Sequence, residues 1–153
     1  MRAPPPRVAR LSIVAPPTEP FEITGGHQDV TFTPDGARIV YTATLGRLLV
    51  VRPLDQLEAT PLRGSESGRN PFVSPDGNWV GFFAGSDDMM KKISLHGGPV
   101  VTICKVESVR GASWGEDDTI VFAPSSQSGL FRVSAAGGEP ERLTTPEEND
   151  GHR

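Results

Sequence analysis

Cysteine is nearly absent from the sequence, which has Cys104 alone among its 153 residues. No disulfide can form within the chain, and no redox compartment follows from bridges. Cys104 ends the apolar run Val100–Cys104. We therefore expect a buried small hydrophobic side chain there rather than a reactive thiol.

Long apolar runs are missing too. No run of about 18 apolar residues exists that would suit a membrane helix. The stretch Leu11–Ala15 is too short for the core of a signal peptide. We expect no membrane segment and no export signal within these residues.

A basic stripe, the usual footprint of a nucleic-acid-binding protein, is also lacking. The chain has 15 Lys and Arg against 19 Asp and Glu, a formal net charge of −4, and the charges are interspersed. The only lysine pair is Lys91-Lys92. We expect a solvated surface and no nucleic-acid partner.

Catalytic motifs do not occur in the sequence. The phosphate loop, strand lysine and metal-binding Asp-Phe-Gly of a protein kinase are absent. The run Gly64–Gly68 imitates the nucleophile elbow of a hydrolase but places Glu66 where the nucleophile belongs, so we interpret it as an exposed loop between blades. We predict no catalytic residue and no cofactor.

Metal-ligand spacing is absent as well. His27, His96 and His152 are isolated. The acidic pairs Asp87-Asp88 and Asp117-Asp118 lack the regular ligand spacing of a calcium loop, and we expect them at hairpin tips. We predict no metal site.

Glycine and proline, in contrast, are abundant, with 17 and 15 residues. Helix interiors exclude both, so short strands joined by turns are expected. The turn sequence Pro34-Asp35-Gly36 recurs as Pro75-Asp76-Gly77, and a degenerate third copy has Asp117. Asp35, Asp76 and Asp117 are spaced by 41 residues each time. Such a period indicates a structural repeat.

Each repeat unit predicts four antiparallel strands. Apolar residues alternate after the turn, as in Val80 and Phe82, which we expect on one side of the sheet. A second turn follows, with Gly97-Gly98 in the second unit and Gly137-Gly138 in the third. The predicted strands lie at 30–32, 38–42, 48–52 and 59–62, at 72–73, 79–83, 90–94 and 100–103, and at 112–114, 119–122, 130–134 and 141–143.

Four antiparallel strands in about 40 residues are typical of one β-propeller blade. We predict an all-β fold of about three blades in an open, partial propeller. An immunoglobulin-like sandwich would not predict three superposable units. The predicted organisation is a Pro/Arg-rich tail at 1–9, a strand preceding the first blade at 10–24, blades at 25–63, 64–104 and 105–145, and the truncated start of a further blade at 146–153.

The Pro-Asp-Gly repeat resembles the WD-like repeats of TolB-type propellers. More specifically, 70–77, 91–99 and 129–134 resemble the propeller region that follows the membrane anchor of many bacterial eukaryotic-like serine/threonine protein kinases. The resemblance runs from about Arg10 through Leu143. If the chain belongs to such a kinase, the resemblance implies that it lies outside the cytoplasm and that the catalytic domain lies on other sequence. If it does not, we expect a cytoplasmic position.

The function expected from these observations is non-catalytic binding of a protein or small-molecule ligand. Ligands of propellers usually meet loop residues at one rim. The candidate rim residues are His27, Asp29, Arg69, Asn70 and Arg110. Trp79 and Trp114 are alternative binding-face residues, but aromatic residues on blade strands more often pack between sheets.

Alternatives remain open at this point: the propeller part of a prolyl-peptidase-like hydrolase, or a TolB-like periplasmic scaffold. Repeats bury their apolar faces only against neighbours. We therefore expect exposed faces on the first and third blades, covered by further blades or by self-association.

Overall fold

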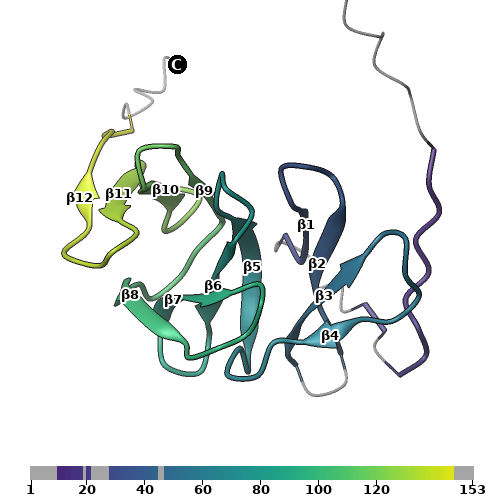
Figure 1. The fold of residues 1–153 in the computed structure, drawn as a ribbon. Coiled ribbons are helices and arrows are strands. Elements are labelled where there is room, and N and C mark those ends of the chain that lie inside the picture. Colours follow the sequence, from purple (N-terminus) through teal and green to yellow (C-terminus); the bar gives the residue numbers. More distant parts are fainter. Residues whose placement is uncertain (1–9, 19, 22–27, 45–46, 147–153) are drawn as a thin grey trace, which may run out of the picture.

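The computed structural model describes residues 10–18, 20–21, 28–44 and 47–146. These residues form twelve strands and no helix. They therefore contain no helix that could cross a membrane. The predicted all-β fold is confirmed (Figure 1).

The strands form three antiparallel sheets of four, each in the order of the sequence. The first sheet has β1 (Val30–Phe32), β2 (Arg38–Thr42), β3 (Leu49–Pro53) and β4 (Thr60–Pro61). The second has β5 (Gly68–Val73), β6 (Trp79–Ala84), β7 (Met89–Ser94) and β8 (Val101–Lys105). The third has β9 (Gly111–Trp114), β10 (Thr119–Ala123), β11 (Phe131–Ser134) and β12 (Glu141–Arg142).

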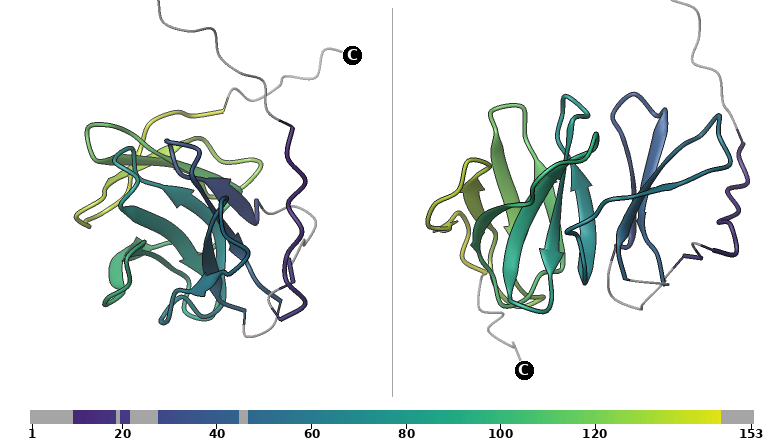
Figure 2. Two further views of the ribbon diagram at one scale, coloured as in Figure 1. Left: turned by 45° about the vertical axis from the view of Figure 1, so that its right-hand side comes forward. Right: turned by 60° about the horizontal axis from the view of Figure 1, so that its bottom comes forward.

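The three sheets lie face to face as successive blades of an arc that does not close (Figures 1 and 2). The first strands of the blades are neighbours in turn, β1 beside β5 and β5 beside β9. The predicted open, partial propeller is therefore correct. β5 begins at Gly68, earlier than expected, because a bulge between Arg69 and Phe72 lets the strand continue.

The repeated turns adopt the geometry that their sequence predicts. The Asp35 carboxylate accepts hydrogen bonds from Thr33 Oγ1 (2.5 Å) and from the backbone N–H of Ala37 (3.0 Å). Asp76 does the same with Ser74 and Asn78 (2.5 and 3.0 Å). In both turns the hydroxyl bond, followed by the backbone bond, lowers the pKa of the carboxyl.

Positive φ angles fall where glycine occurs in these turns. Gly36 and Gly77 have φ of 69° and 71°. In the third turn Asp117 accepts a bond from the Thr119 N–H (3.1 Å), but Asp118 takes the glycine position with φ 57°. The Gly-Gly turns agree with the prediction, since Gly97, Gly98, Gly137 and Gly138 all have positive φ.

Two apolar seams hold the blades together. In the first seam, Val40, Leu49 and Val51 of the first blade pack against Val80, Phe82, Ile93 and Leu95 of the second. In the second seam, Phe72, Phe83 and Met90 of the second blade pack against Trp114, Ile120 and Phe122 of the third. Val80 and Phe82 share one side of β6, as the alternation predicts.

The outer face of the first blade is covered by residues 10–18 and 20–21 (Figure 2). Phe21 contacts Tyr41 with ring centroids 4.3 Å apart, and Ile13 packs on the same cluster. Arg52 Nη1 donates to the Val14 carbonyl (2.7 Å). Tyr41 is consequently 0% exposed, so the expectation that this face is exposed is wrong.

The strand expected at 10–24 does not form over its described residues. Residues 10–16 have no ladder partner, and a single bridge joins Phe21 to Ala43. Pro16, Pro17 and Pro20 lack the N–H that a ladder needs. The segment covers the blade through side chains instead of extending a sheet.

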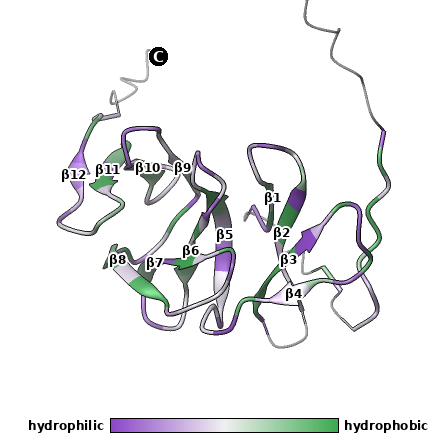
Figure 3. Cartoon of the chain, in the orientation of Figure 1, coloured by the Kyte–Doolittle hydropathy of each residue, from purple (hydrophilic) through white to green (hydrophobic). Residues whose placement is uncertain are grey.

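The outer face of the third blade is polar. Ser113, Val121, Arg132 and Glu141 stand in one row across its four strands. Arg132 and Glu141 form an ion pair at 2.9 Å, with side chains 49% and 67% exposed. Figure 3 shows the last strand, β12, as hydrophilic.

Candidate functional site

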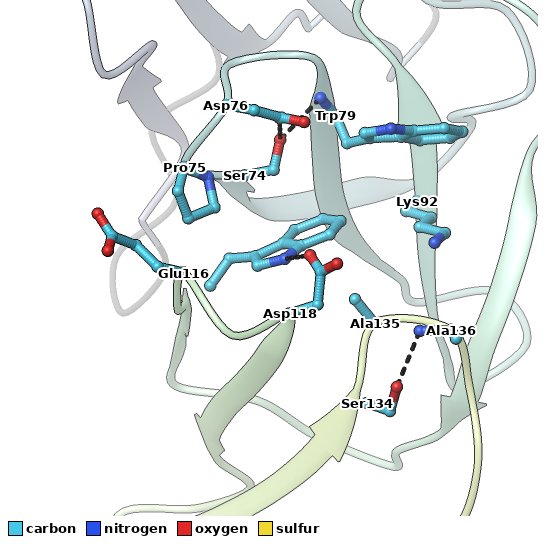
Figure 4. Close-up of a pocket in the computed structure, with 11 residues that line it drawn as sticks. Ser74, Pro75, Asp76, Trp79, Lys92, Glu116, Asp118, Ser134, Ala135 and Ala136 are labelled. Atoms are coloured by element: carbon cyan, nitrogen blue, oxygen red, sulfur yellow. Dashed lines mark hydrogen bonds between the residues drawn. The ribbon is translucent and has the colours of Figure 1, made fainter.

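The turns of the second and third blades enclose a cavity of about 660 Å³ at one end of the second seam (Figure 4). The second blade contributes its Ser-Pro-Asp turn and two strand residues, and the third contributes residues of both of its turns and two strand residues. The lining residues are Ser74, Pro75, Asp76, Trp79, Lys92, Trp114, Glu116, Asp118, Ser134, Ala135 and Ala136.

Both tryptophans of the chain line this cavity together with Lys92. The Lys92 ammonium lies 5.0 Å from the Trp79 ring centroid and 5.9 Å from that of Trp114. Both distances fit cation–π attraction. Trp114 is 8% exposed and contacts Phe72, so it also has the packing role expected from the sequence.

Three carboxylates surround the same space. Asp118 accepts a hydrogen bond from the Trp114 indole N–H (3.1 Å), which orients the ring. Asp76 is held in its turn and keeps a lowered pKa, so it carries a negative charge at neutral pH. Glu116 is exposed and lies at the opposite end of the cavity from Lys92 in Figure 4. The lining thus has three acidic groups and one basic group.

One small side chain helps to keep the cavity open. Leu95 of the second blade fills the first seam at 5% exposure. The residue at the same position of the third blade is Ala135, which lines the cavity. The two residues make matching backbone hydrogen bonds. The Leu95 N–H donates to the Asn78 carbonyl and the Ala135 N–H donates to the Asp118 carbonyl, each at 2.8 Å. The first seam holds a cavity of only about 220 Å³.

The rim predicted from the sequence lies at the opposite ends of the strands. There Asn70 is 4% exposed and joins three blades. Its side-chain oxygen accepts from the Gln28 N–H (2.7 Å), and its Nδ2 donates to the Val109 carbonyl (3.3 Å). The φ of Asn70 is 49°, which asparagine tolerates better than most residues. This geometry is structural, while a ligand role for Asn70 stays a prediction.

The other rim candidates are only partly brought together. Arg69 lines a cavity of about 140 Å³ with Asn70 and residues 107–109. Asp29 is 5% exposed, and its carbonyl accepts from the Thr42 N–H (3.0 Å). Arg110 is exposed and its backbone N–H bonds to Ala123 O (2.8 Å). His27 lies outside the described residues.

The loop that imitates a nucleophile elbow is partly buried, not fully exposed as expected. Ser65 is 0% exposed, and its hydroxyl donates to Leu62 O (2.5 Å) and accepts from the Leu49 N–H (2.9 Å). Gly64 and Glu66 are exposed there. These bonds fasten the loop to β3, so its serines serve the fold.

Cys104 is buried, as expected. Burial, with a contribution from Glu139, raises the pKa of its thiol to about 11. Among the described residues no three His, Cys, Asp or Glu side chains gather so as to hold a metal ion.

Known folds were found for the chain among solved structures, although no family model and no curated protein matches it. A putative TolB from Agrobacterium tumefaciens superposes with TM-score 0.66 at 18% identity over 77% of this chain and 46% of its own. A nidogen/laminin complex gives 0.66 at 10%, over 77% and 48%. The β-propeller domain of the Trilobed protease from Pyrococcus furiosus, described as having an open velcro topology, gives 0.57 at 14%, over 77% and 43%.

These likenesses establish the β-propeller fold. The chain spans less than half the length of each of these solved structures. Some similar propellers are enzymes, such as an oligogalacturonate lyase. The fold alone therefore does not decide between binding and catalysis.

Sequence reasoning missed the seam cavity as a site. It treated Trp79, Trp114 and Lys92 separately, because they lie on three strands of two blades. A usable signal was present at repeat-equivalent positions. Trp79 and Lys92 correspond to Arg38 and Val51, and Glu116 to Pro75, so the differences gather at one seam.

Proposed function

We propose that this chain is a non-catalytic binding module, three blades of a larger β-propeller that hold a ligand at the second seam. The cavity of about 660 Å³ lined by two tryptophans and four charged side chains carries this proposal. Concave sites with aromatic walls and a few polar groups are the usual form of ligand sites. The nidogen/laminin match supports it, since that structure is a protein–protein complex.

The proposed context is the one implied by the sequence resemblance, the propeller region of a membrane-anchored bacterial serine/threonine kinase. In that context the blades would lie outside the cytoplasm and sense a ligand or hold a partner protein. The candidate rim at Asp29, Arg69, Asn70 and Arg110 remains a second proposed contact surface.

Tryptophan fluorescence tests the binding proposal, because both tryptophans line the cavity. Compounds and peptides of varied chemistry are titrated into the full chain and into Ala135→Leu, which places a larger side chain in the cavity wall. Ligands that shift emission only in the parent chain, and that are recovered chemically unchanged, support the proposal. Conversion of a bound compound to product would overturn the non-catalytic assignment.

We also propose that another blade covers the third blade's outer face, either from further sequence or from a second copy. Val121 is half-buried there between polar neighbours. Sedimentation velocity across a concentration series tests the second-copy form. Concentration-dependent dimers that weaken in Arg132→Glu, where two carboxylates would face each other, support it, and a monomer at all concentrations would contradict it.

A further inference from the structure

We propose that the second-seam cavity takes a guanidinium group, presented by an arginine side chain of a partner peptide, between Trp79 and Trp114 and against the carboxylate of Asp118, with Glu116 and Asp76 adding negative charge to the lining. This inference deepens the proposed function and rests on it. It names the ligand chemistry that the cavity fits.

The cation preference follows from the lining. The lining contains three carboxylates and one ammonium, so the cavity is acidic. The one cation that is present, the Lys92 ammonium, already lies near both indole rings. The rings therefore present faces that a cation can approach from within the cavity.

The first seam shows which cation fits between two blades at the equivalent position. Arg38 occupies the position that Trp79 has in the next blade, and its Nη2 donates to the Gly77 carbonyl across the seam (3.0 Å). In the second seam this arginine is replaced by tryptophan, and the residue equivalent to Gly77 is Asp118. The second seam thus has no arginine at this position. At the place where Arg38 finds the Gly77 carbonyl in the first seam, the second seam carries the Asp118 carboxylate as an additional acceptor.

Guanidinium suits these groups better than ammonium does. It is planar, stacks on aromatic faces and bonds a carboxylate through two parallel N–H groups. One oxygen of Asp118 holds the indole N–H, and a carboxylate has lone pairs for further donors. The volume of about 660 Å³ also admits the flanking peptide.

The test titrates the full chain with the capped peptides acetyl-Gly-Arg-Gly-amide and acetyl-Gly-citrulline-Gly-amide, read by tryptophan emission. Citrulline keeps the shape of arginine without its charge. We expect the arginine peptide to bind roughly tenfold more tightly, with affinity that falls as salt rises. Equal affinity, or no emission change with either peptide, would overturn the inference.

A third arm separates the two sources of the group. Methylguanidine is a free guanidinium without a peptide. Binding of the arginine peptide well above that of methylguanidine supports a peptide partner, whereas equal binding would overturn the partner and leave a small cationic ligand.

Variants locate the site. Glu116→Gln should weaken the arginine peptide several-fold, while Glu58→Gln, the same change at an exposed residue outside the cavity, should not. Lys92→Met should tighten it by removing a competing cation. Lys91→Met, next in the strand and paired with Asp87, is the matched control. An affinity unchanged in both Glu116→Gln and Lys92→Met would overturn the assignment.

The outcome separates this inference from the proposed function. If other ligands shift emission in the parent chain but not in Ala135→Leu, while the arginine and citrulline peptides behave alike, the cavity binds and only the guanidinium assignment fails. If nothing shifts emission, both fail.

Discussion

The first and second seams have the same backbone plan and different contents. Across the first, Leu95 and the Arg38 side chain fill the space, and the remaining cavity is about 220 Å³. Across the second, Ala135 leaves the space open, and Trp79, Lys92 and Glu116 surround a cavity three times larger. A repeat protein can thus turn a structural seam into a site by changing a few repeat-equivalent side chains.

The two seams also differ in their aromatic packing. Phe72 lies over Gly81, where a Cβ would run into its ring. The matching pair in the first blade is Thr31 and Val40. Removing one side chain in β6 therefore made room for a large ring from β5, which in turn supports Trp114 at 6.2 Å.

Hollowing the first seam should have the largest effect. Leu95→Ala creates there the vacancy that the second seam already has, and should lower the free energy of unfolding by about 2–5 kcal/mol because a buried leucine is lost. Urea denaturation measures it. Leu57→Ala, at 83% exposure, is the control and should change stability by less than about 0.5 kcal/mol.

Crowding the second seam comes next. Gly81→Ala forces Phe72 from its place and should cost about 1–3 kcal/mol. Gly85→Ala is the matched control, since a Cβ there meets nothing. Equal urea midpoints for the two variants would mean that the close approach of Phe72 does not limit the seam.

Cutting the polar link of the first seam should have a smaller effect. Arg38→Met keeps most of the aliphatic stem but removes the bond to the Gly77 carbonyl, at a cost of about 1 kcal/mol. Thermal unfolding compares it with Arg63→Met, an exposed arginine. A loss no greater than that of Arg63→Met would show that the bond contributes nothing to closing the seam.

Acid should affect the two seams alike, because their Asp35 and Asp76 turns match. In the folded chain the pKa of each carboxyl is below its ordinary value of 3.8. The stabilisation is therefore present above the unfolded pKa and is lost as the pH falls through the folded pKa. Stability measured from pH 5 downward should therefore fall, and less steeply in Asp35→Asn or Asp76→Asn. Asp55→Asn is the control for removing an exposed carboxylate outside these turns.

Much of the fold was predictable because its information is local. Pro-Asp-Gly and Gly-Gly form turns within a few residues. Proline fixes φ, the aspartate accepts a hydrogen bond from the backbone two residues on, and glycine adopts positive φ. The alternation of Val80 and Phe82 then decided which side faces the first seam. Repetition at 41 residues made each local prediction testable against its copies.

The cavity was not predictable in the same way. Trp79 and Trp114 are each compatible with simple packing, and Ala135 is unremarkable until it is compared with Leu95. Their meeting depends on how two blades lie against each other. The degenerate third turn, with Glu116 and Asp118 in place of proline and glycine, makes that meeting point acidic.

Three four-stranded blades, their turns and the order of their strands could be predicted from the sequence, since each depends on contacts between residues close along the chain. Three further features are visible only in the folded chain: residues 10–18 and 20–21 cover the first blade, Asn70 joins three blades, and Lys92 lies near both tryptophans. These arrangements join residues about 13 to 42 positions apart, and their contacts are set by packing between sheets and not by local conformational preference.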